Sequence, residues 1–354
     1  MKAIMHPPVD MFKTAKWAFS TRRVNRMDAV RMNDQFENAQ AGDLILGRVS
    51  EIGQHRNIQL TSGRRSLLYP GDLVVLACGA RYAPDQFEGV AKINPAGADM
   101  LAGGGCIGEM RLRNERIRPA TKILPLGRIM AKDGTPLNLE RYALPKARIP
   151  TALPVIVVFG TAMNSGKTLA TARLAYGMRR AGLKVAALKG TGTGAFGDYN
   201  EYADTGVHYV ADFTDAGMVT TYQEPLDRIK TGVETLLSSA ERAGCDIAVM
   251  EIADGLYQRE TAELLNDTWF RTRIGGLVFA CGDAVAASGG VTELKRLGYR
   301  PDVLTGILSC SPMAAAEARA ATGVRVVNKS DLADPSEAMM LARKAFVPCA
   351  LAAE

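Results

Sequence analysis

The stretch PVIVVFGTAMNSGKTLATARLAYGMRRAG, residues 154–182, decides the fold. It opens with a short, β-branched and continuously apolar run, which is typical of a buried parallel strand. Residues 169–181 read as a helix that ends in two arginines before Gly182, the usual signal for a helix C-terminus. The polar segment between them, 159–168, therefore has the strand–loop–helix context of a phosphate-binding loop.

Each polar residue type in this loop suits a bound phosphate. Gly166 permits close backbone approach, and the amides at the helix start point at the phosphates. We expect Lys167 to act as a catalytic residue beside the β- and γ-phosphates, and Thr168 to give its hydroxyl to Mg²⁺. The predicted nucleotide-binding residues of the loop are Gly160, Thr161, Asn164, Ser165, Gly166, Lys167 and Thr168.

Strands and helices alternate after the loop. The expected strands are 184–188, 247–251, 276–280, 303–308 and 324–327, and the expected helices are 226–243, 291–297, 313–321 and 336–344. This alternation predicts an α/β fold with a mostly parallel P-loop sheet flanked by helices.

The first 150 residues have a different pattern of polar and apolar residues from the rest of the chain. Residues 1–39 are polar and basic, with short helices expected at 13–20 and 26–38. Short apolar or alternating runs then predict a smaller β-rich domain, either a barrel or a sandwich; they are 44–49, 58–61, 67–69, 73–77 and 90–93. The predicted organisation is a basic N-terminal segment at 1–39, a β-rich domain and linker at 40–150, and a P-loop NTPase domain at 151–354. We expect 151–354 to fold alone.

Composition excludes several classes of protein. The chain has 354 residues, of which 47% are hydrophobic and 23% charged, as expected for a globular protein of about two domains. No apolar run approaches the roughly 18 residues of a membrane span. The six cysteines form no CxxC pair, which disfavours a zinc ribbon or a disulfide framework. These features predict a reduced, cytoplasmic protein with no membrane partner.

Charge is unevenly distributed. Residues 1–150 carry 23 Lys and Arg against 14 Asp and Glu, a net +9, whereas 151–354 carry 20 against 23, a net −3. The basic run from Arg111 to Arg128 fits either a patch for an anionic partner or a solvated strand face. No aromatic residue interleaves with it for base stacking, so nucleic acid is not expected as a partner. GGGCIG at 103–108 matches GxGxxG, but it lacks the flanking strand and helix and is interpreted as a turn.

The loop resembles that of dethiobiotin synthetase, Gly-Thr-Asp-Thr-x-Val-Gly-Lys-Thr, because its first glycine, Gly160, precedes Thr161. ALKGTGTG looks like that family's Lys-Pro-Val-x-Ser-Gly segment and places Lys189 as a second, phosphate-side catalytic lysine. MEIADG looks like its Glu-Gly-Ala-Gly-Gly, an element shared with the cobyrinic and cobyric acid synthetases, and places Glu251 as the magnesium glutamate. The resemblance covers about 160–330.

This resemblance implies a P-loop enzyme of the SIMIBI class that uses ATP and Mg²⁺ on a small molecule. The arrangement is also similar to an uncharacterised bacterial P-loop domain family, whose loop leads into a Val-Ala-Asp-Phe stretch comparable to 210–213.

A nucleotide-bound Mg²⁺ needs further oxygen ligands near Thr168. Glu251 ends an apolar strand at the carboxyl edge of the sheet, with Asp254 a close alternative. The segment 197–217 adds four more candidates, Asp198, Asp204, Asp212 and Asp215. Asp204 is chosen by its loose position in the resembling family. The predicted metal ligands are Thr168, Asp204 and Glu251. His208 is interpreted as a packed or surface histidine.

Asn328-Lys329-Ser330-Asp331 matches the guanine-reading Asn-Lys-x-Asp of GTPases. In this chain the motif follows a strand that is one later than in those proteins. A polar turn that caps the helix at Ser336 therefore explains these residues equally well. Asn328 and Asp331 are kept as base-binding candidates. ATP is preferred by resemblance, and GTP remains open.

Two functions remain open. The first is an ATP- and Mg²⁺-dependent ligase or phosphotransferase that acts on a carboxylate, carbamate or hydroxyl of a small molecule, with the glycine-rich stretch 190–197 as a lid. The second is a nucleotide-dependent switch or chaperone that acts on a protein partner. We also expect a homo-oligomer.

Overall fold

The computed structural model describes residues 4–5, 10–147 and 149–346, and these form two compact units. The first unit comprises the described residues up to Leu144, together with Gly192–Gly197 and Phe213–Glu224. The second comprises the remainder of the described chain. After entering the second unit, the chain therefore passes back into the first unit twice, at Gly192–Gly197 and at Phe213–Glu224.

Five strands of the first unit close into a ring. They pair in the order β12 (Thr121–Met130), β4 (Leu44–Glu51), β7 (Leu73–Cys78) and β11 (Cys106–Arg113), and β10 (Ala98–Ala102) joins β11 back to β12. Neighbours are antiparallel except β7 and β11. The predicted β-rich fold is therefore confirmed, and its form is a barrel.

All five strands contribute to one apolar core. Buried side chains from each of them meet there, among them Ile45, Val74, Met100, Ile107 and Ile123. The ring is so tightly filled that a side chain on Gly47 would meet Ile123 Cγ2 at 2.3 Å.

Short elements complete the first unit. The strands are β1 (Ile4–Met5), β2 (Lys16–Trp17), β3 (Arg31–Asn33), β5 (Asn57–Gln59), β6 (Arg65–Leu67), β8 (Arg81–Tyr82) and β9 (Phe87–Val90), with one helix, α1 (Asp10–Thr14), and 3₁₀ turns at Phe19–Thr21, Arg26–Asp28, Phe36–Asn38 and Leu139–Tyr142. The helices predicted at 13–20 and 26–38 are wrong. Only Lys13 and Thr14, at the end of α1, are in an α-helix. The other residues form short strands and turns, and apolar side chains such as Trp17 pack into the unit's second core cluster.

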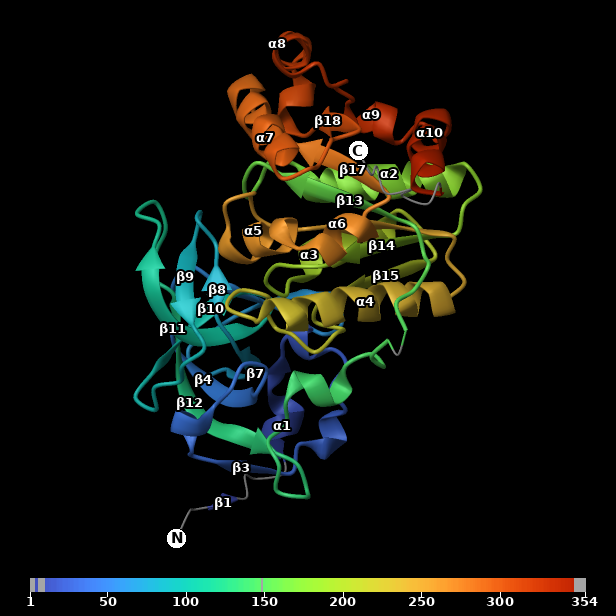
Figure 1. The fold of residues 1–354 in the computed structure, drawn as a ribbon. Helices are drawn as coiled ribbons and strands as arrows, with labels where there is room; N and C mark the ends of the chain where they lie inside the picture. The colour runs from blue at the N-terminus through green and yellow to red at the C-terminus, as the bar shows by residue number, and fades with distance from the viewer. Residues whose placement is uncertain (1–3, 6–9, 148, 347–354) are drawn as a thin grey trace. The chain divides into compact units, whose positions relative to one another are not determined.

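The second unit is built on a six-stranded parallel sheet of order β15-β14-β16-β13-β17-β18 (Figure 1). Its strands are β13 (Val155–Gly160), β14 (Val185–Lys189), β15 (Tyr209–Asp212), β16 (Ile247–Glu251), β17 (Gly276–Ala280) and β18 (Val303–Thr305). Its helices are α2 (Lys167–Arg180), α3 (Phe196–Asp204), α4 (Leu226–Arg242), α5 (Arg259–Asn266), α6 (Thr268–Arg273), α7 (Ala284–Arg296), α8 (Pro312–Thr322), α9 (Lys329–Leu332) and α10 (Pro335–Phe346), with a 3₁₀ turn at Ile307–Cys310. This is the predicted mixed α/β fold.

Helices cover both faces of this sheet. Side chains of α2, α9 and α10 pack on alternate strand residues such as Val158 and Val249. On the opposite face, Phe159 of β13 packs edge-on against Phe270 of α6, and Phe279 of β17 packs close to Gly290 of α7. Burial on both faces explains why the strand sequences are continuously apolar rather than alternating.

The two segments that return to the first unit are firmly held there. Gly194 N donates to Val219 O (2.9 Å), and Phe196 N donates to Gln59 Oε1 (2.6 Å). The side chain of Val219 belongs to the second core cluster of that unit. The stretch predicted as a lid is thus an anchored segment.

A fragment of residues 151–354 is expected to fold incompletely, contrary to the expectation from the strand–helix alternation of its sequence. It would carry Phe196, Phe213 and Val219 without the first unit that buries them. We expect it to bind the dye ANS and to unfold with a smaller m-value than the full chain. A fragment that binds no dye and unfolds with one sharp transition would contradict this expectation.

Within the described residues, no helix is long and apolar enough to cross a bilayer.

Candidate functional site

The phosphate loop lies between β13 and α2 at the carboxyl edge of the parallel sheet. Asn164 (φ 62°) and Gly166 (φ 101°) both have left-handed backbone conformations, and Gly166 caps α2. Gly160 is required by close packing, because a Cβ there would lie 2.2 Å from Ser165 Oγ. Thr161 N donates to Ala280 O (3.0 Å), which ties the start of the loop to the neighbouring strand β17.

One polar atom of the loop is buried without a partner. Ser165 Oγ has no hydrogen-bond partner within the described chain, although the residue is only 4% exposed. A buried hydroxyl of this kind requires an explanation, because desolvation without a hydrogen bond costs about 1–3 kcal/mol. A loop-bound anion would satisfy it.

Lys167 is the first residue of α2, and its ammonium reaches back across the loop. Nζ donates to Ala162 O (2.8 Å) and to Asp254 O (2.8 Å). Burial lowers the pKa of Lys167, and the nearby carboxylates of Glu251 and Asp254 oppose this shift. The loop therefore concentrates a poorly solvated positive charge beside the positive end of the α2 dipole.

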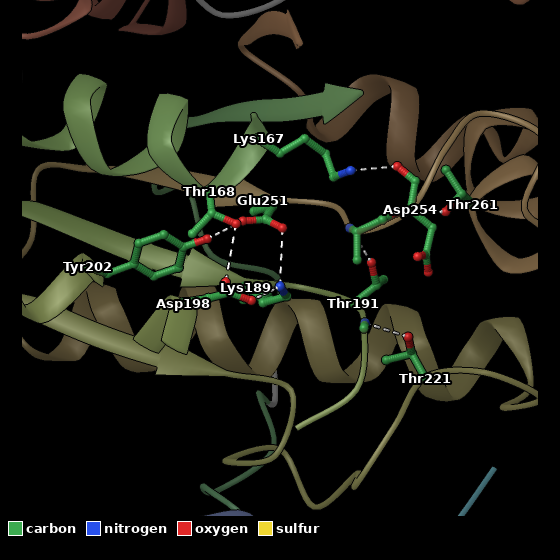
Figure 2. Close-up of polar contacts among 12 residues, drawn as sticks. Lys167, Thr168, Lys189, Thr191, Asp198, Tyr202, Thr221, Glu251, Asp254 and Thr261 are labelled. Atoms are coloured by element: carbon green, nitrogen blue, oxygen red, sulfur yellow. Dashed lines mark hydrogen bonds and ion pairs between the residues drawn. The ribbon is translucent and has the colours of Figure 1, made fainter. Parts of the chain in front are cut away.

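Lys189, at the end of β14, lies between two carboxylates (Figure 2). Its ammonium donates to Asp198, and also to Glu251 Oε1 at 3.1 Å. Tyr202 donates its hydroxyl to the other oxygen of Glu251, and Thr168 Oγ1 donates to Asp198 Oδ1 (3.3 Å). The network thus links α2, β14, α3 and β16 at one sheet edge.

The opposite charges within this network determine which of its side chains are protonated. Burial alone would lower the pKa of Lys189, but Glu251 and Asp198 raise it above its usual range. Burial would raise the pKa of Asp198, but the Lys189 ammonium and the hydrogen bonds from Lys189 and Thr168 bring it below its ordinary value. Burial, reinforced by Glu251, raises the pKa of Tyr202 well above its ordinary value. Lys189 is therefore charged and Tyr202 neutral at physiological pH.

The donors around Thr168 suit a magnesium ion bound with a nucleotide. Mg²⁺ is usually held by one or two carboxylates together with phosphate oxygens and water. Thr168, Asp198 and Glu251 offer this set, joined by the hydrogen bonds above. No cluster of three or more His, Cys, Asp or Glu side chains suited to a metal occurs among the residues that the structure describes. The protein residues alone thus supply only part of a coordination shell.

The aspartate beside Thr168 is Asp198, six residues before the predicted metal ligand Asp204. The structure brings Asp198, in the first turn of α3, to Thr168, whereas Asp204 is exposed at the last residue of that helix. Asp215 lies in the first unit, where it pairs with Arg22 (2.6 Å). His208 is exposed at the amino end of β15, where its Nδ1 accepts a 3.4 Å hydrogen bond from Val185 N.

A pocket of about 490 Å³ adjoins the phosphate loop. It is bounded by Gly166 and Leu169 on the loop side, by the 3₁₀ turn after β18, and by the start of α9. Asn328, Lys329 and Ser330 line it. Its position next to the loop and its largely apolar walls suit a nucleoside.

Asp331, by contrast, caps a helix. Its Oδ2 accepts from Asn328 N (2.9 Å), and Asn328 Oδ1 accepts from the amides of Ser330 (2.7 Å) and Asp331 (3.1 Å), a reciprocal capping box. Asp331 lines a separate hollow on the other side of Asn328. The alternative prediction of a polar cap is therefore correct in kind, but the helix capped is α9 rather than the one at Ser336.

Two other sequence motifs have structural roles. The first three glycines of GGGCIG form the turn of the β10–β11 hairpin, where Gly104 and Gly105 allow other segments of the first unit to approach closely. The basic run is not one continuous patch: Lys122 pairs with Asp99 (2.6 Å) and Arg128 with the buried Asp43 (2.8 Å).

The parallel sheet and the loop between β13 and α2 define the second unit as a P-loop nucleotide-binding fold. No protein-family model matches the sequence, and no curated protein matches it.

Several solved structures are similar over about half of the chain. They include the 54 kDa signal recognition particle protein of Aeropyrum pernix K1 in complex with GDP (20% identity, 56% of this chain and 47% of that one, TM-score 0.36) and the signal recognition particle receptor FtsY of Elizabethkingia anophelis (14%, 54% and 54%, 0.33). A third is the hydrogenase maturation factor HypB of Archaeoglobus fulgidus (16%, 55% and 90%, 0.36). The chain spans about half the length of the first two.

Proposed function

We propose that the protein is an ATP- and Mg²⁺-dependent enzyme that transfers the γ-phosphoryl group to a small molecule. The observation that carries this proposal is the convergence of two lysines, the buried Lys167 and the largely buried Lys189, with oxygen donors at a phosphate loop. Positive charge fixed where phosphoryl charge develops is the main catalytic device for this chemistry.

The residues present fit the nucleotide. The unpartnered Ser165 hydroxyl, the amides at the start of α2 and Lys167 would hold the phosphates, and the pocket beside Gly166 would hold the nucleoside. Thr168, Asp198 and Glu251 would hold Mg²⁺, which neutralises phosphate charge when bound. Lys189 would keep the two carboxylates aligned.

Only the resemblance of the sequence motifs indicates which type of phosphoryl transfer the protein catalyses. The loop, the Lys189 segment and the Glu251 segment resemble dethiobiotin synthetase and the cobyrinic and cobyric acid synthetases, which favours a ligase over a simple kinase. A screen of metabolite pools for compounds that accelerate ADP release tests this proposal. A wild-type chain that binds no nucleotide by calorimetry would refute it.

A second candidate function is a nucleotide-dependent switch. The observation that favours it is the return of Gly192–Gly197 and Phe213–Glu224 to the first unit directly after β14 and β15. Changes at Lys189 would then be transmitted along the backbone to that unit. A switch hydrolyses slowly and is accelerated by a protein partner, whereas the proposed enzyme is accelerated by a small co-substrate.

ATP is expected to bind at least as tightly as GTP, and Asp331→Ala is expected to leave this preference unchanged. The Asp331 carboxylate serves the α9 cap, so its loss should cost about 1 kcal/mol of stability instead. Calorimetric titrations with non-hydrolysable ATP and GTP analogues and Mg²⁺ measure the preference.

The matched control for that variant is Asp334→Ala. Asp334 Oδ1 accepts from the amides of Ser336 (2.9 Å) and Glu337 (3.1 Å) at the start of α10. The Asp334→Ala variant therefore removes a similar helix cap. A GTP preference of roughly a hundredfold, about 2.7 kcal/mol, that vanishes only in Asp331→Ala would establish guanine recognition.

A further inference from the structure

The three residues after Ile252, Ala253 to Gly255, are held in place on several sides. Ala253 N donates to Thr191 Oγ1 (2.8 Å), and Ala253 O accepts from Thr261 Oγ1 (3.2 Å). The next carbonyl, that of Asp254, accepts from the Lys167 ammonium. This backbone is therefore fixed to the segment that follows β14, to α5 and to α2 at once (Figure 2).

Asp254 has an unfavourable backbone conformation for a residue with a side chain. Its φ is 63°, in the left-handed region that glycine adopts at least cost. Gly255 follows it and packs on the phosphate loop so closely that a Cβ there would lie 2.4 Å from Thr161 O. The chain thus keeps a carboxylate at a position where glycine would cost less conformational free energy. Residues held in such strained conformations cluster at functional sites.

The Asp254 carboxylate has no hydrogen-bond or ion-pair partner among the described residues. In Figure 2 it points away from the Lys167 ammonium, while the backbone carbonyl of the same residue accepts the bond. The carboxylate of this fixed segment therefore remains available to a ligand.

Four charged groups face Asp254 from the surrounding elements. They are Lys167 of α2, Lys189 of β14, Glu251 of β16 and Glu260 of α5. Burial raises the pKa of Asp254 to about 6; the two lysines oppose this shift, and the two glutamates reinforce it. A carboxylate that titrates just below neutral pH is suited to accepting a proton during a reaction.

We propose that Asp254 is the general base of the site, and that the acceptor of the phosphoryl group is a hydroxyl, of a small molecule or of water. This inference rests on the proposed function, selects one of the three acceptor classes compatible with it, and departs from the ligase that the sequence resemblance favours. A carboxylate or carbamate acceptor is already ionised and needs no base. It would also be repelled by the negative charge of Asp254.

Transfer of the phosphoryl group to the hydroxyl needs no oxidant or reductant. The hydroxyl proton passes to the Asp254 carboxylate as the hydroxyl oxygen forms its bond to the γ-phosphorus. The bond from that phosphorus to the bridging oxygen breaks, and its electron pair leaves with the nucleoside diphosphate. Since the base must be ionised, turnover should rise as pH passes through about 6 and fall below it.

The test compares Asp254→Asn and Asp254→Gly with the full-length wild-type chain, using MgATP with water as the acceptor. Glycine accepts the left-handed backbone and keeps the carbonyl that binds Lys167, so a purely structural role predicts an active Asp254→Gly enzyme. We expect both variants to lose at least a hundredfold in kcat while the Kd for a non-hydrolysable ATP analogue changes less than threefold. The rise of kcat near pH 6 should disappear, and added formate should partly restore Asp254→Gly.

Asp246→Asn is the matched control, because Asp246 precedes the same strand at its opposite end, where it accepts from Lys184 N. It should retain wild-type kcat. Wild-type kcat in Asp254→Gly or Asp254→Asn would overturn the proposal, as would a tenfold increase in the Mg²⁺ requirement, which would mark a metal ligand. Nucleotide binding without hydrolysis by the wild type would also overturn it. Absence of nucleotide binding would instead refute the proposed function.

Discussion

Lys167→Ala is expected to abolish nucleotide turnover while the second unit keeps its fold. Lys167 is only 5% exposed, and its ammonium crosses the phosphate loop to two backbone carbonyls. Removing one such charge from the developing phosphoryl group costs about 3–4 kcal/mol, or roughly 10² to 10³ in kcat. Because burial already penalises the ammonium, its loss should cost little folding stability.

Phosphate release measures this effect, and circular dichroism checks the fold. The matched control is Lys184→Ala, an exposed lysine just before β14 and at the opposite edge of the sheet. Turnover in Lys167→Ala at the control's rate would show that phosphoryl transfer does not occur at this loop.

Lys189→Met is expected to destabilise the protein by about 3–5 kcal/mol, the usual cost of removing one partner from a buried ion pair. Asp198 and Glu251 would then face each other without the ammonium between them. Protonation would relieve this repulsion, so the variant should regain stability relative to the wild type as pH falls. Mg²⁺ should also stabilise the variant more than the wild type, because it can replace the lost charge.

Urea unfolding at several pH values and Mg²⁺ concentrations measures that change. The double variant Lys189→Met/Glu251→Gln provides the control, since it removes one of the two opposing charges and should recover part of the loss. A single variant as stable as the wild type at neutral pH would show that the ion pairs contribute nothing to folding.

The sequence predicts the second unit well where the signal is local. The run 154–182 contains a complete strand, loop and helix, and both Lys167 and Thr168 are identified by their place between them. The strands β16 and β17 lie at the predicted residues, because strands covered on both faces are continuously apolar.

The difference between Asp204 and Asp198 has a geometric cause. The sequence predicts no helix at 196–204, but these residues form α3, in which six residues advance the chain by about 9 Å. Only the first turn of that helix lies beside Thr168, so Asp198 is the residue that reaches it. An acidic residue in the first turn of a short helix was the available signal.

The free carboxylate of Asp254 could not be found from the sequence, because its environment is made by distant residues. Thr191, Thr261 and Lys167 hold its backbone from three different elements. The same holds for Gly192–Gly197 and Phe213–Glu224, whose place in the first unit depends on pairing with residues far away along the chain.

That arrangement has a consequence for synthesis on the ribosome. The first unit needs Phe213–Glu224 to complete its core, and this segment ends 80 residues after Leu144 (224 minus 144). At the usual elongation rate, the nascent barrel would wait about 4 to 16 seconds for it. During that time the surface destined for Val219 stays uncovered and open to chaperones. Rare codons between β13 and β15 should therefore lower the yield of native protein more than rare codons after α4.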